Sequence, residues 1–253
     1  MNPLILYDNA LTRGMLTSSS LVSGYNVQNV KDGRPYTFVK FANPGTNYII
    51  VDLAANTNAS AVAISGHNFG TVGAILTIQR WNGSEWVDIT ILDSNYVAGS
   101  NKNQLYYFGL LASTKFKIII TNTLGLPYVG VVSLGYALQM EYPPDGPRAP
   151  FTESIVADTE YSEDGNLLGT VIKYNPVMFT HTYTNLTRTF VQQSYLTFWN
   201  THGKLLKPFF YALDLDYEPD VFYGIIDPAS VHQTPASNLN YYDELTMQMM
   251  GTI

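Results

Sequence analysis

Residues 74–91 read AILTIQRWNGSEWVDITI, and this stretch predicts a β-hairpin. Two runs rich in apolar, β-branched and aromatic residues, 74–80 and 86–91, flank Asn82-Gly83, a dipeptide typical of hairpin turns. The same pattern recurs further along the chain, where Phe116, Ile118 and Ile120 alternate with Lys117, Ile119 and Thr121. Alternation of this kind favours strands that bury one face.

Runs like these fill the region before residue 142. We expect further strands at residues 36–41, 48–53, 60–65, 104–108 and 129–138, separated by Gly, Asn, Pro and Ser. About eight strands without a long helical periodicity predict a mainly β fold, with a jelly-roll β-sandwich over residues 1–142.

A proline-rich segment follows the predicted sandwich. Four prolines lie in residues 143–150: Pro143, Pro144, Pro147 and Pro150. Proline fixes φ and removes a backbone donor, so this segment cannot continue a sheet. We therefore expect a linker at 143–150 and a separate domain at 151–253.

The predicted second domain is α+β, with one helix packed on an antiparallel sheet. Thr187 can cap the helix, Leu186 and Val191 can form the hydrophobic staple, and Gly203 can end it. The apolar stripe of this helix is Val191, Tyr195, Phe198 and Trp199. Strands are expected at residues 170–173, 177–184, 208–213, 221–226 and 239–250.

The composition excludes several classes of function. The chain of 253 residues has 13 Lys and Arg against 20 Asp and Glu, a net charge of −7. A cationic surface for phosphate is therefore missing, and we expect no sequence-specific nucleic-acid binding. The absence of Cys excludes disulfides and thiolate metal sites. No apolar run approaches the roughly 18 residues needed to cross a bilayer, so we expect no membrane insertion.

Alternating acids make the segment 214–220 a weak candidate for a metal site. The sequence DLDYEPD alternates the acids Asp214, Asp216, Glu218 and Asp220 with Leu215, Tyr217 and Pro219, and the candidate ligands are Asp214, Asp216 and Asp220. Alternate residues of a strand share a face, so these carboxylates could converge on a hard cation. The alternative is an exposed acidic loop between two strands. The acids of residues 158–164 are interpreted in the same way, as a solvated or partner-facing turn.

Trp81 is a weak candidate for carbohydrate binding, because it adjoins the predicted Asn82-Gly83 turn. An aromatic face can pack on the apolar face of a pyranose. Trp86 lies inside a strand pattern and Trp199 on the helix stripe, so both are expected in the core.

The sequence contains no recognisable catalytic set. His67, His181, His202 and His232 lack metal-ligand spacing, and no nucleophile elbow or P-loop is present. A polysaccharide-degrading enzyme with paired carboxylates remains a less favoured alternative, because no specific pair can be assigned. We expect no catalytic residues and no cofactor.

Several motifs carry a resemblance to known protein modules. They are residues 27–34 (VQNVKDGR), 48–53 (YIIVDL), 61–70 (AVAISGHNFG) and 131–138 (VVSLGYAL). With these motifs the first half resembles the discoidin-like, galactose-binding-domain-like jelly rolls of phage tail proteins. The second half is similar to the ring-forming domain of phage minor and distal tail proteins, through residues 165–169 (GNLLG), 185–188 (NLTR), 207–211 (KPFFY) and 217–221 (YEPDV).

The resemblance implies a structural component of a tailed-bacteriophage tail tip. Such a protein would form or decorate a homo-oligomeric ring around the tail channel, with other phage tail proteins as partners. It would be located in the virion after synthesis in the bacterial host cytoplasm. Low charge and abundant Tyr and Met suit extensive protein interfaces. The alternative function is a carbohydrate-binding module that contacts a glycan of the host cell surface.

Overall fold

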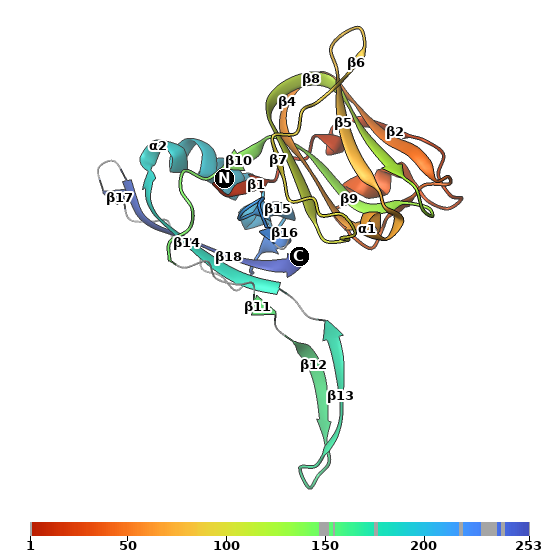
Figure 1. Ribbon diagram of the computed structural model, residues 1–253. Helices are drawn as coiled ribbons and strands as arrows, with labels where there is room; N and C mark the ends of the chain where they lie inside the picture. Colours follow the sequence, from red (N-terminus) through yellow and green to blue (C-terminus); the bar gives the residue numbers. More distant parts are fainter. Residues whose placement is uncertain are drawn as a thin grey trace. The chain divides into compact units, whose positions relative to one another are not determined.

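The computed structural model describes residues 2–146, 152–153, 155–174, 177–217, 220–228, 237–238 and 241–252. The chain is mostly β, with 53% strand and 14% helix in several antiparallel sheets, as the sequence predicts. It divides into two compact units (Figure 1). Unit 1 comprises Met1–Met140 and Phe209–Tyr223, and unit 2 comprises Glu141–Pro208 and Gly224–Ile253.

Two long antiparallel strands form the centre of unit 1. These are β4 (Gly45–His67) and β8 (Gln104–Asn122), which lie side by side in Figure 1. The sequence predicted two strands in each of these segments. Both instead continue through irregular stretches, between Asp52 and Thr57 and around Gly109. Gly109 has a φ of 74°, a conformation that glycine adopts at little cost, so β8 bends there without leaving the sheet.

The other strands of unit 1 are arranged around this pair. The sheet order is β3-β9-β4-β8-β5-β6, with β2 paired to β4 and β7 to β8. Their bounds are β2 (Met15–Ser18), β3 (Val39–Lys40), β5 (Ile75–Trp81), β6 (Trp86–Asp88), β7 (Asp93–Ser94) and β9 (Tyr128–Gly135). Short helical turns occupy η1 (Ala10–Thr12), η2 (Val27–Lys31) and α1 (Phe69–Val72). The hairpin predicted at Asn82-Gly83 is confirmed as the β5–β6 pair.

The main core of unit 1 follows the alternation of the sequence. Ile49 and Val51 of β4 and Phe116, Ile118 and Ile120 of β8 are all buried in it. Leu76 and Ile78 of β5 lie in the same cluster. Because successive residues of a strand point to opposite faces, the residues between them lie on the other face of the sheet.

A second apolar cluster covers the other half of β4. Ala61 and Ala63 are buried there beneath Phe210 and Val221, next to β1 (Leu4–Leu6). β1 pairs with β10 (Ala137–Gln139) and with β15 (Phe209–Ala212). The compact units therefore differ from the predicted continuous domains, 1–142 and 151–253. Residues 209–223 belong with the first unit because they bury the outward-facing side chains of β4 and β8.

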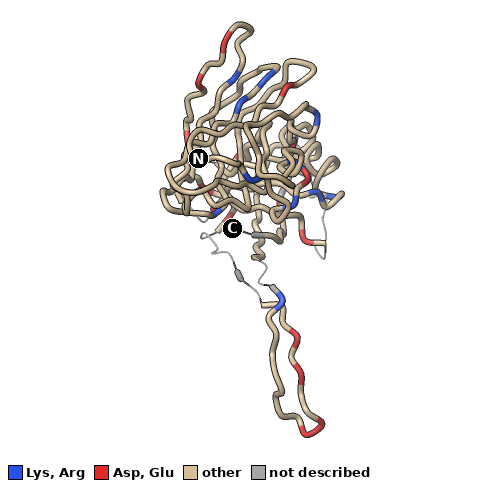
Figure 2. The backbone as a smooth tube through the Cα atoms, turned by 90° about the vertical axis from the view of Figure 1, so that its right-hand side faces the viewer, with Lys and Arg blue, Asp and Glu red and all other residues tan. Residues whose placement is uncertain are grey.

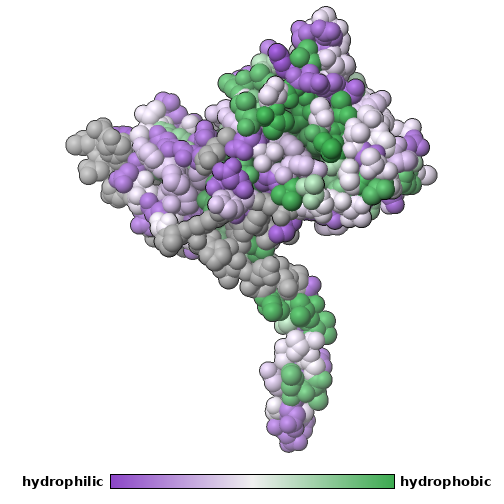
Figure 3. All heavy atoms as spheres, in the orientation of Figure 1, coloured by the Kyte–Doolittle hydropathy of each residue, from purple (hydrophilic) through white to green (hydrophobic). Residues whose placement is uncertain are grey.

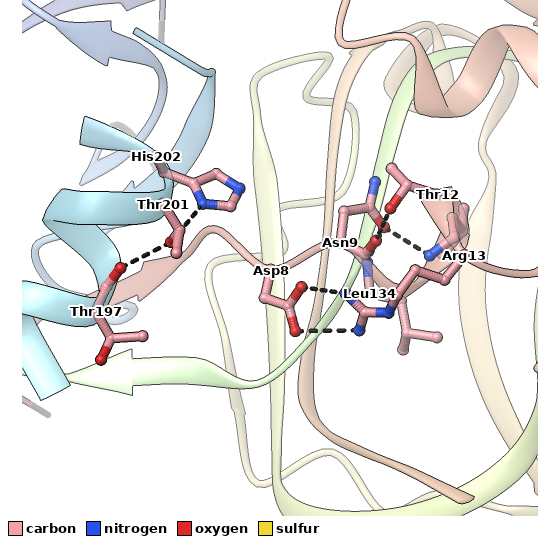
Figure 4. A network of polar contacts seen from close by, with 9 residues as sticks. Asp8, Asn9, Thr12, Arg13, Leu134, Thr197, Thr201 and His202 are labelled. Atoms are coloured by element: carbon pink, nitrogen blue, oxygen red, sulfur yellow. Dashed lines mark hydrogen bonds and ion pairs between the residues drawn. The ribbon is translucent and has the colours of Figure 1, made fainter. Parts of the chain in front are cut away.

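The N-terminal segment of unit 1 is fastened to β9 by the side chain of Asn9. Its Nδ2 donates to the Val132 carbonyl at 2.9 Å, and its Oδ1 accepts from the Leu134 amide at 3.2 Å. Figure 4 shows Asn9 beside Leu134, with Asp8 paired to Arg13. Gly135 is required at the end of β9, since a Cβ there would lie 1.9 Å from the Asp8 carbonyl oxygen.

Unit 2 is built on the antiparallel pair β14 (Val177–Thr187) and β18 (Tyr241–Thr252). Two short strands extend it, β11 (Thr152–Glu153) on β14 and β17 (Ser237–Asn238) on β18. A separate hairpin is formed by β12 (Val156–Tyr161) and β13 (Leu167–Tyr174). The boundary between the two units falls within β16 (Val221–Ile226), after Tyr223. Residues 147–150 of the predicted linker and 239–240 of the last predicted strand lie outside the described residues.

The predicted helix is confirmed, with an irregular interior. It consists of α2 (Arg188–Phe190), a π-helical turn at Val191–Tyr195 and α3 (Leu196–Thr201), followed by the 3-10 turn η4 (Gly203–Leu205). The Thr187 hydroxyl accepts from the Phe190 amide at 3.2 Å, so the predicted cap is present. Leu186 and Val191, the predicted staple pair, are both buried. Among the described residues, no helix combines the length and hydropathy needed to cross a bilayer.

Candidate functional site

The outward face of the β2-β4-β8-β5-β6 side of unit 1 carries aromatic and charged side chains. Register places Asp52 opposite Lys115, Ile50 opposite Lys117, and Tyr48 opposite Ile119. Lys117 in turn lies opposite Gln79, which lies opposite Asp88. Directly opposed residues of antiparallel strands share a face. We call this set the platform: Tyr48, Asp52, Gln79, Trp81, Trp86, Asp88, Lys115 and Lys117.

Two tryptophans form the outer end of the platform. Trp81 and Trp86 are directly opposed in the β5–β6 hairpin, and their rings meet edge to face with centroids 5.5 Å apart. The turn between them is held by Asn82, whose Oδ1 accepts from the backbone amides of Ser84 and Glu85, each at 2.9 Å. The Ser113 hydroxyl of β8 donates to the Trp81 carbonyl at 2.8 Å. The hairpin thus holds both rings in a defined orientation, each half-buried.

A lysine lies among the aromatic rings. The Lys117 ammonium is 5.1 Å from the centroid of the Tyr48 ring and 5.8 Å from that of the Trp86 ring. These distances are within the range of cation–π attraction, about 0.5–1 kcal/mol at exposed sites. Within the part of the chain that the structure describes, no carboxylate pairs with this ammonium.

The other charged groups of the platform already have partners. Lys115 Nζ donates to Asp52 Oδ2 at 2.6 Å, and both side chains are more than a third exposed. Gln79 Nε2 donates to Asp88 Oδ1 at 2.8 Å. Amide, carboxylate and ammonium groups therefore surround the two indole rings. This combination offers apolar faces for a sugar ring together with donors and acceptors for its hydroxyls.

The three tryptophans lie in different surroundings, and not all of them lie where the sequence predicts. Trp81 lies on the platform, at the hairpin where the sequence suggested an exposed aromatic residue. The prediction that Trp86 lies in the core is wrong, because its strand is at the edge of the sheet and its ring faces outward beside Trp81. Trp199 is half-buried and lines an open cavity of about 280 Å³ in unit 2, with Gly203, Lys204, Leu206, Ile226, Asp227 and Pro228.

The acidic residues proposed for a cation do not converge. Among the described residues, no group of three or more His, Cys, Asp or Glu side chains could hold a metal ion. The segment after β15 is a turn rather than a strand, so the alternation does not place Asp214, Asp216 and Asp220 on one face. Asp214 Oδ1 accepts from the Asp216 amide at 3.1 Å, whereas Asp220 is buried. Glu218 lies outside the described residues.

The histidines do not form a site either. His67 and His181 are buried separately, in unit 1 and unit 2, and burial lowers the pKa of each to about 4. His67 Nε2 donates to the Lys102 carbonyl at 2.8 Å, while its Nδ1 accepts from the Phe69 amide at 3.2 Å. This pairing fits the neutral ring. His232 lies outside the described residues.

Sequence reasoning identified only Trp81 of the platform and assigned Trp86 to the core. The residues it missed are Tyr48, Asp52, Gln79, Asp88, Lys115 and Lys117. A signal was present in the hairpin, because a strand pair that turns at 82–85 brings Trp81 and Trp86 to the same face. The positions of Tyr48 and Lys117 depend on which strands are neighbours in the sheet. That order follows from the pairing of β4 with β8 and of β8 with β5, which local patterns do not reveal.

Comparison with known proteins gives likenesses of fold. No protein-family model and no curated protein matches the chain. Solved structures match about half of it. The chitosan-binding module 1 from the chitosanase/glucanase of Paenibacillus sp. IK-5 is 16% identical, with a TM-score of 0.41, over 51% of this chain and 98% of that module. The CBM32 of AlyQ, in complex with 4,5-unsaturated mannuronic acid, is 18% identical, with a TM-score of 0.39, over 51% and 95%.

Part of a longer enzyme is also similar to this chain. The GH29 fucosidase E1_10125 of Ruminococcus gnavus is 15% identical, with a TM-score of 0.42, over 52% of this chain. The match spans only 27% of the fucosidase. Likenesses as weak as these carry no inference about a ligand or an activity. Carbohydrate-binding modules with a β-sandwich are thus among the structural neighbours of this chain.

Proposed function

We propose that this protein binds carbohydrate through the platform of unit 1. The observation that carries the proposal is the pair of half-buried indole rings at the β5–β6 hairpin, surrounded by hydrogen-bonding side chains. Indole rings presented by a strand pair lose little conformational entropy when a sugar stacks on them, because the sheet already orients them. No catalytic step is proposed for this surface.

The Lys117 side chain takes part in the binding. Its ammonium lies over the rings of Tyr48 and Trp86, where a stacked pyranose would sit. A flexible lysine can move aside at the cost of a weak cation–π contact and then meet a polar group of the sugar.

A glycan array probed with the full chain tests the proposal, followed by calorimetric titration of any glycan that binds. Trp81→Ala and Trp86→Ala are each expected to weaken binding about tenfold or more, the effect of losing about 1.4 kcal/mol of contact energy. Tyr36→Ala is the matched control, since Tyr36 is 73% exposed and precedes β3, at the opposite edge of the sheet from β6. Equal binding by all four proteins, or no binding to any glycan, would refute the proposal.

A second candidate function, as a structural subunit of a phage tail tip, is favoured by the β12–β13 hairpin. The hairpin pairs with no other strand among the described residues and exposes several apolar side chains. Leu168 is 66% and Val171 68% exposed. Figure 3 shows hydrophobic residues along the hairpin, and Figure 2 shows acidic residues at its tip. A two-stranded hairpin alone is marginally stable in water, so a partner surface would explain its apolar residues.

This second function predicts a homo-oligomeric ring located in a virion with other tail proteins. Light scattering after size exclusion is expected to show an oligomer in the wild-type protein and a monomer in Val171→Lys. Thr90→Lys, at an exposed position of unit 1 outside the hairpin, is the control for the added charge. A monomer at all concentrations, and no ring in assembled particles by electron microscopy, would exclude this role.

A further inference from the structure

We infer that the glycan bound by the platform is anionic, a pyranose that carries a carboxylate or a sulfate, with Lys117 as its charge partner. This inference rests on the proposed carbohydrate-binding function and specifies the class of ligand.

Among the described residues, Lys117 of the platform forms no ion pair with a carboxylate. Asp52 accepts from Lys115 at 2.6 Å. Asp88 accepts from the neutral amide of Gln79 at 2.8 Å, so it keeps its own charge and is not paired with Lys117. Lys117 contacts only rings, those of Tyr48 and Trp86, among the interactions of the described residues. A cation held over aromatic rings remains available to an anion that arrives from solvent.

The Lys117 ammonium lies over the Trp86 ring, 5.8 Å from its centre, so a pyranose that stacks on this ring displaces the lysine side chain. The side chain is long and flexible, and the displaced ammonium can then reach the edge of the sugar. Carboxylate and sulfate substituents project from the edge of a pyranose ring. The resulting N⁺–H···O⁻ hydrogen bond is roughly twice as strong as a neutral one. Gln79 lies between Lys117 and Asp88 across the sheet. From there its amide can form hydrogen bonds with the sugar hydroxyls.

Charge is distributed unevenly along the chain. Residues 1–140 contain eight Lys and Arg against six Asp and Glu, whereas residues 141–253 contain five against fourteen. Of those fourteen acids, Asp214, Asp216 and Asp220 belong to the segment that covers the Ala61–Ala63 half of β4. The platform lies on the other half, at Tyr48 and Asp52. Within the platform, Lys115 and Lys117 balance Asp52 and Asp88, so attraction of an anion depends on the short-range contact with Lys117. Salt screens exposed charges beyond about 8–10 Å.

Matched glycans give the decisive experiment. The full-length protein is titrated with oligogalacturonate and with the same oligosaccharide after carboxyl reduction, and with a sulfated galactan and its desulfated form. We expect the wild-type protein to bind at least one anionic form about tenfold tighter than its neutral counterpart, and the difference to shrink with added salt. The pair that shows the preference identifies the anion as carboxylate or sulfate.

Variants of lysine assign the preference to one residue. Lys117→Gln is expected to bring the ratio of anionic to neutral affinity close to one, and Lys117→Arg to retain most of it. Lys102→Gln, which makes the same change of net charge at an exposed lysine outside the platform, is expected to leave the ratio unchanged. Thermal unfolding of each variant confirms that it folds.

The outcomes separate this inference from the function on which it rests. Equal affinity of the wild-type protein for charged and neutral forms overturns the inference and leaves carbohydrate binding intact. A preference that survives in Lys117→Gln also overturns it. Binding to none of the four glycans, nor to any on the array, overturns the proposed function itself.

Discussion

The ring of Trp86 meets the ring of Trp81 edge to face across the β5–β6 hairpin, with centroids 5.5 Å apart. The Lys117 ammonium lies over the Trp86 ring from β8, the strand that pairs with β5 on the side away from β6. At this edge of the sheet the two tryptophans therefore pack on each other across the hairpin and also present an accessible aromatic surface.

The pair Trp81 and Trp86 is expected to stabilise unit 1 as well as to bind carbohydrate. Trp86→Ala should lower the free energy of unfolding by about 1–2 kcal/mol, because a half-buried ring and its aromatic contact are lost. A double-mutant cycle with Trp81→Ala should give a coupling of about 0.5–1.5 kcal/mol in chemical denaturation. Strict additivity of the two substitutions would show that the rings do not interact.

Buried His67 predicts a dependence of stability on pH. Burial lowers its pKa to about 4 in the folded protein, against 6.5 for the free side chain. The unfolded state therefore binds more protons between these values, and stability is complete above pH 6.5 and falls as the pH drops towards 4. The loss amounts to about 3 kcal/mol.

Chemical denaturation between pH 7 and 4.5 measures this effect. His67→Gln is expected to flatten the slope of unfolding free energy against pH by about one proton. The remaining slope includes His181, whose pKa is lowered in the same way. An unaltered slope in His67→Gln would contradict the assignment.

Gly135 is expected to tolerate no side chain. A Cβ at this position would lie 1.9 Å from the Asp8 carbonyl oxygen, a contact that the backbone must move to relieve. Gly135→Ala should therefore cost about 1–3 kcal/mol or more, measured as a lower midpoint of thermal unfolding. Gly169→Ala in β13 is the control, since a Cβ there meets no atom within 4 Å.

Thr187 links the start of the helix to Glu141, the first residue of unit 2. Its hydroxyl accepts from the Phe190 amide and donates to Glu141 Oε1 at 2.6 Å, and its amide donates to Glu141 Oε2 at 2.7 Å. Thr187→Ala is expected to lower the unfolding free energy by about 1–2 kcal/mol. Thr187→Ser, which keeps the hydroxyl, should recover most of this loss in the same assay.

Much of the local structure could be predicted from the sequence because it depends on neighbouring residues. The strand at Val221–Ile226 was predicted with its correct bounds, and the Thr187 cap was identified from residue types alone. The turn at Asn82 followed from its composition, although its side chain organises a loop of four residues rather than two. These features obey short-range rules of periodicity and hydrogen bonding.

Other features required the tertiary structure. Leu4–Leu6 and Met15–Ser18 are too short to show a period, and β1 is a strand because β10 and β15 pair with it. The apolar run Ala61–Ile64 is buried on both faces because residues 209–223 return to cover it. The prolines of residues 143–150 indicated a boundary close to Met140, where the first part of unit 1 ends. They did not indicate that residues 209–223 belong to the same unit.

The sequence by itself determined a mainly β chain, with a hairpin at Asn82, a capped helix after Thr187 and a tryptophan beside a turn. The tertiary structure decided that Trp86 faces outward with Trp81, that Lys117 lies between two rings, and that Asp214, Asp216 and Asp220 do not form a cation site. The reason is physical. Periodicity tells which residues of one strand share a face, whereas a binding surface depends on which strands are neighbours and which faces the rest of the chain covers.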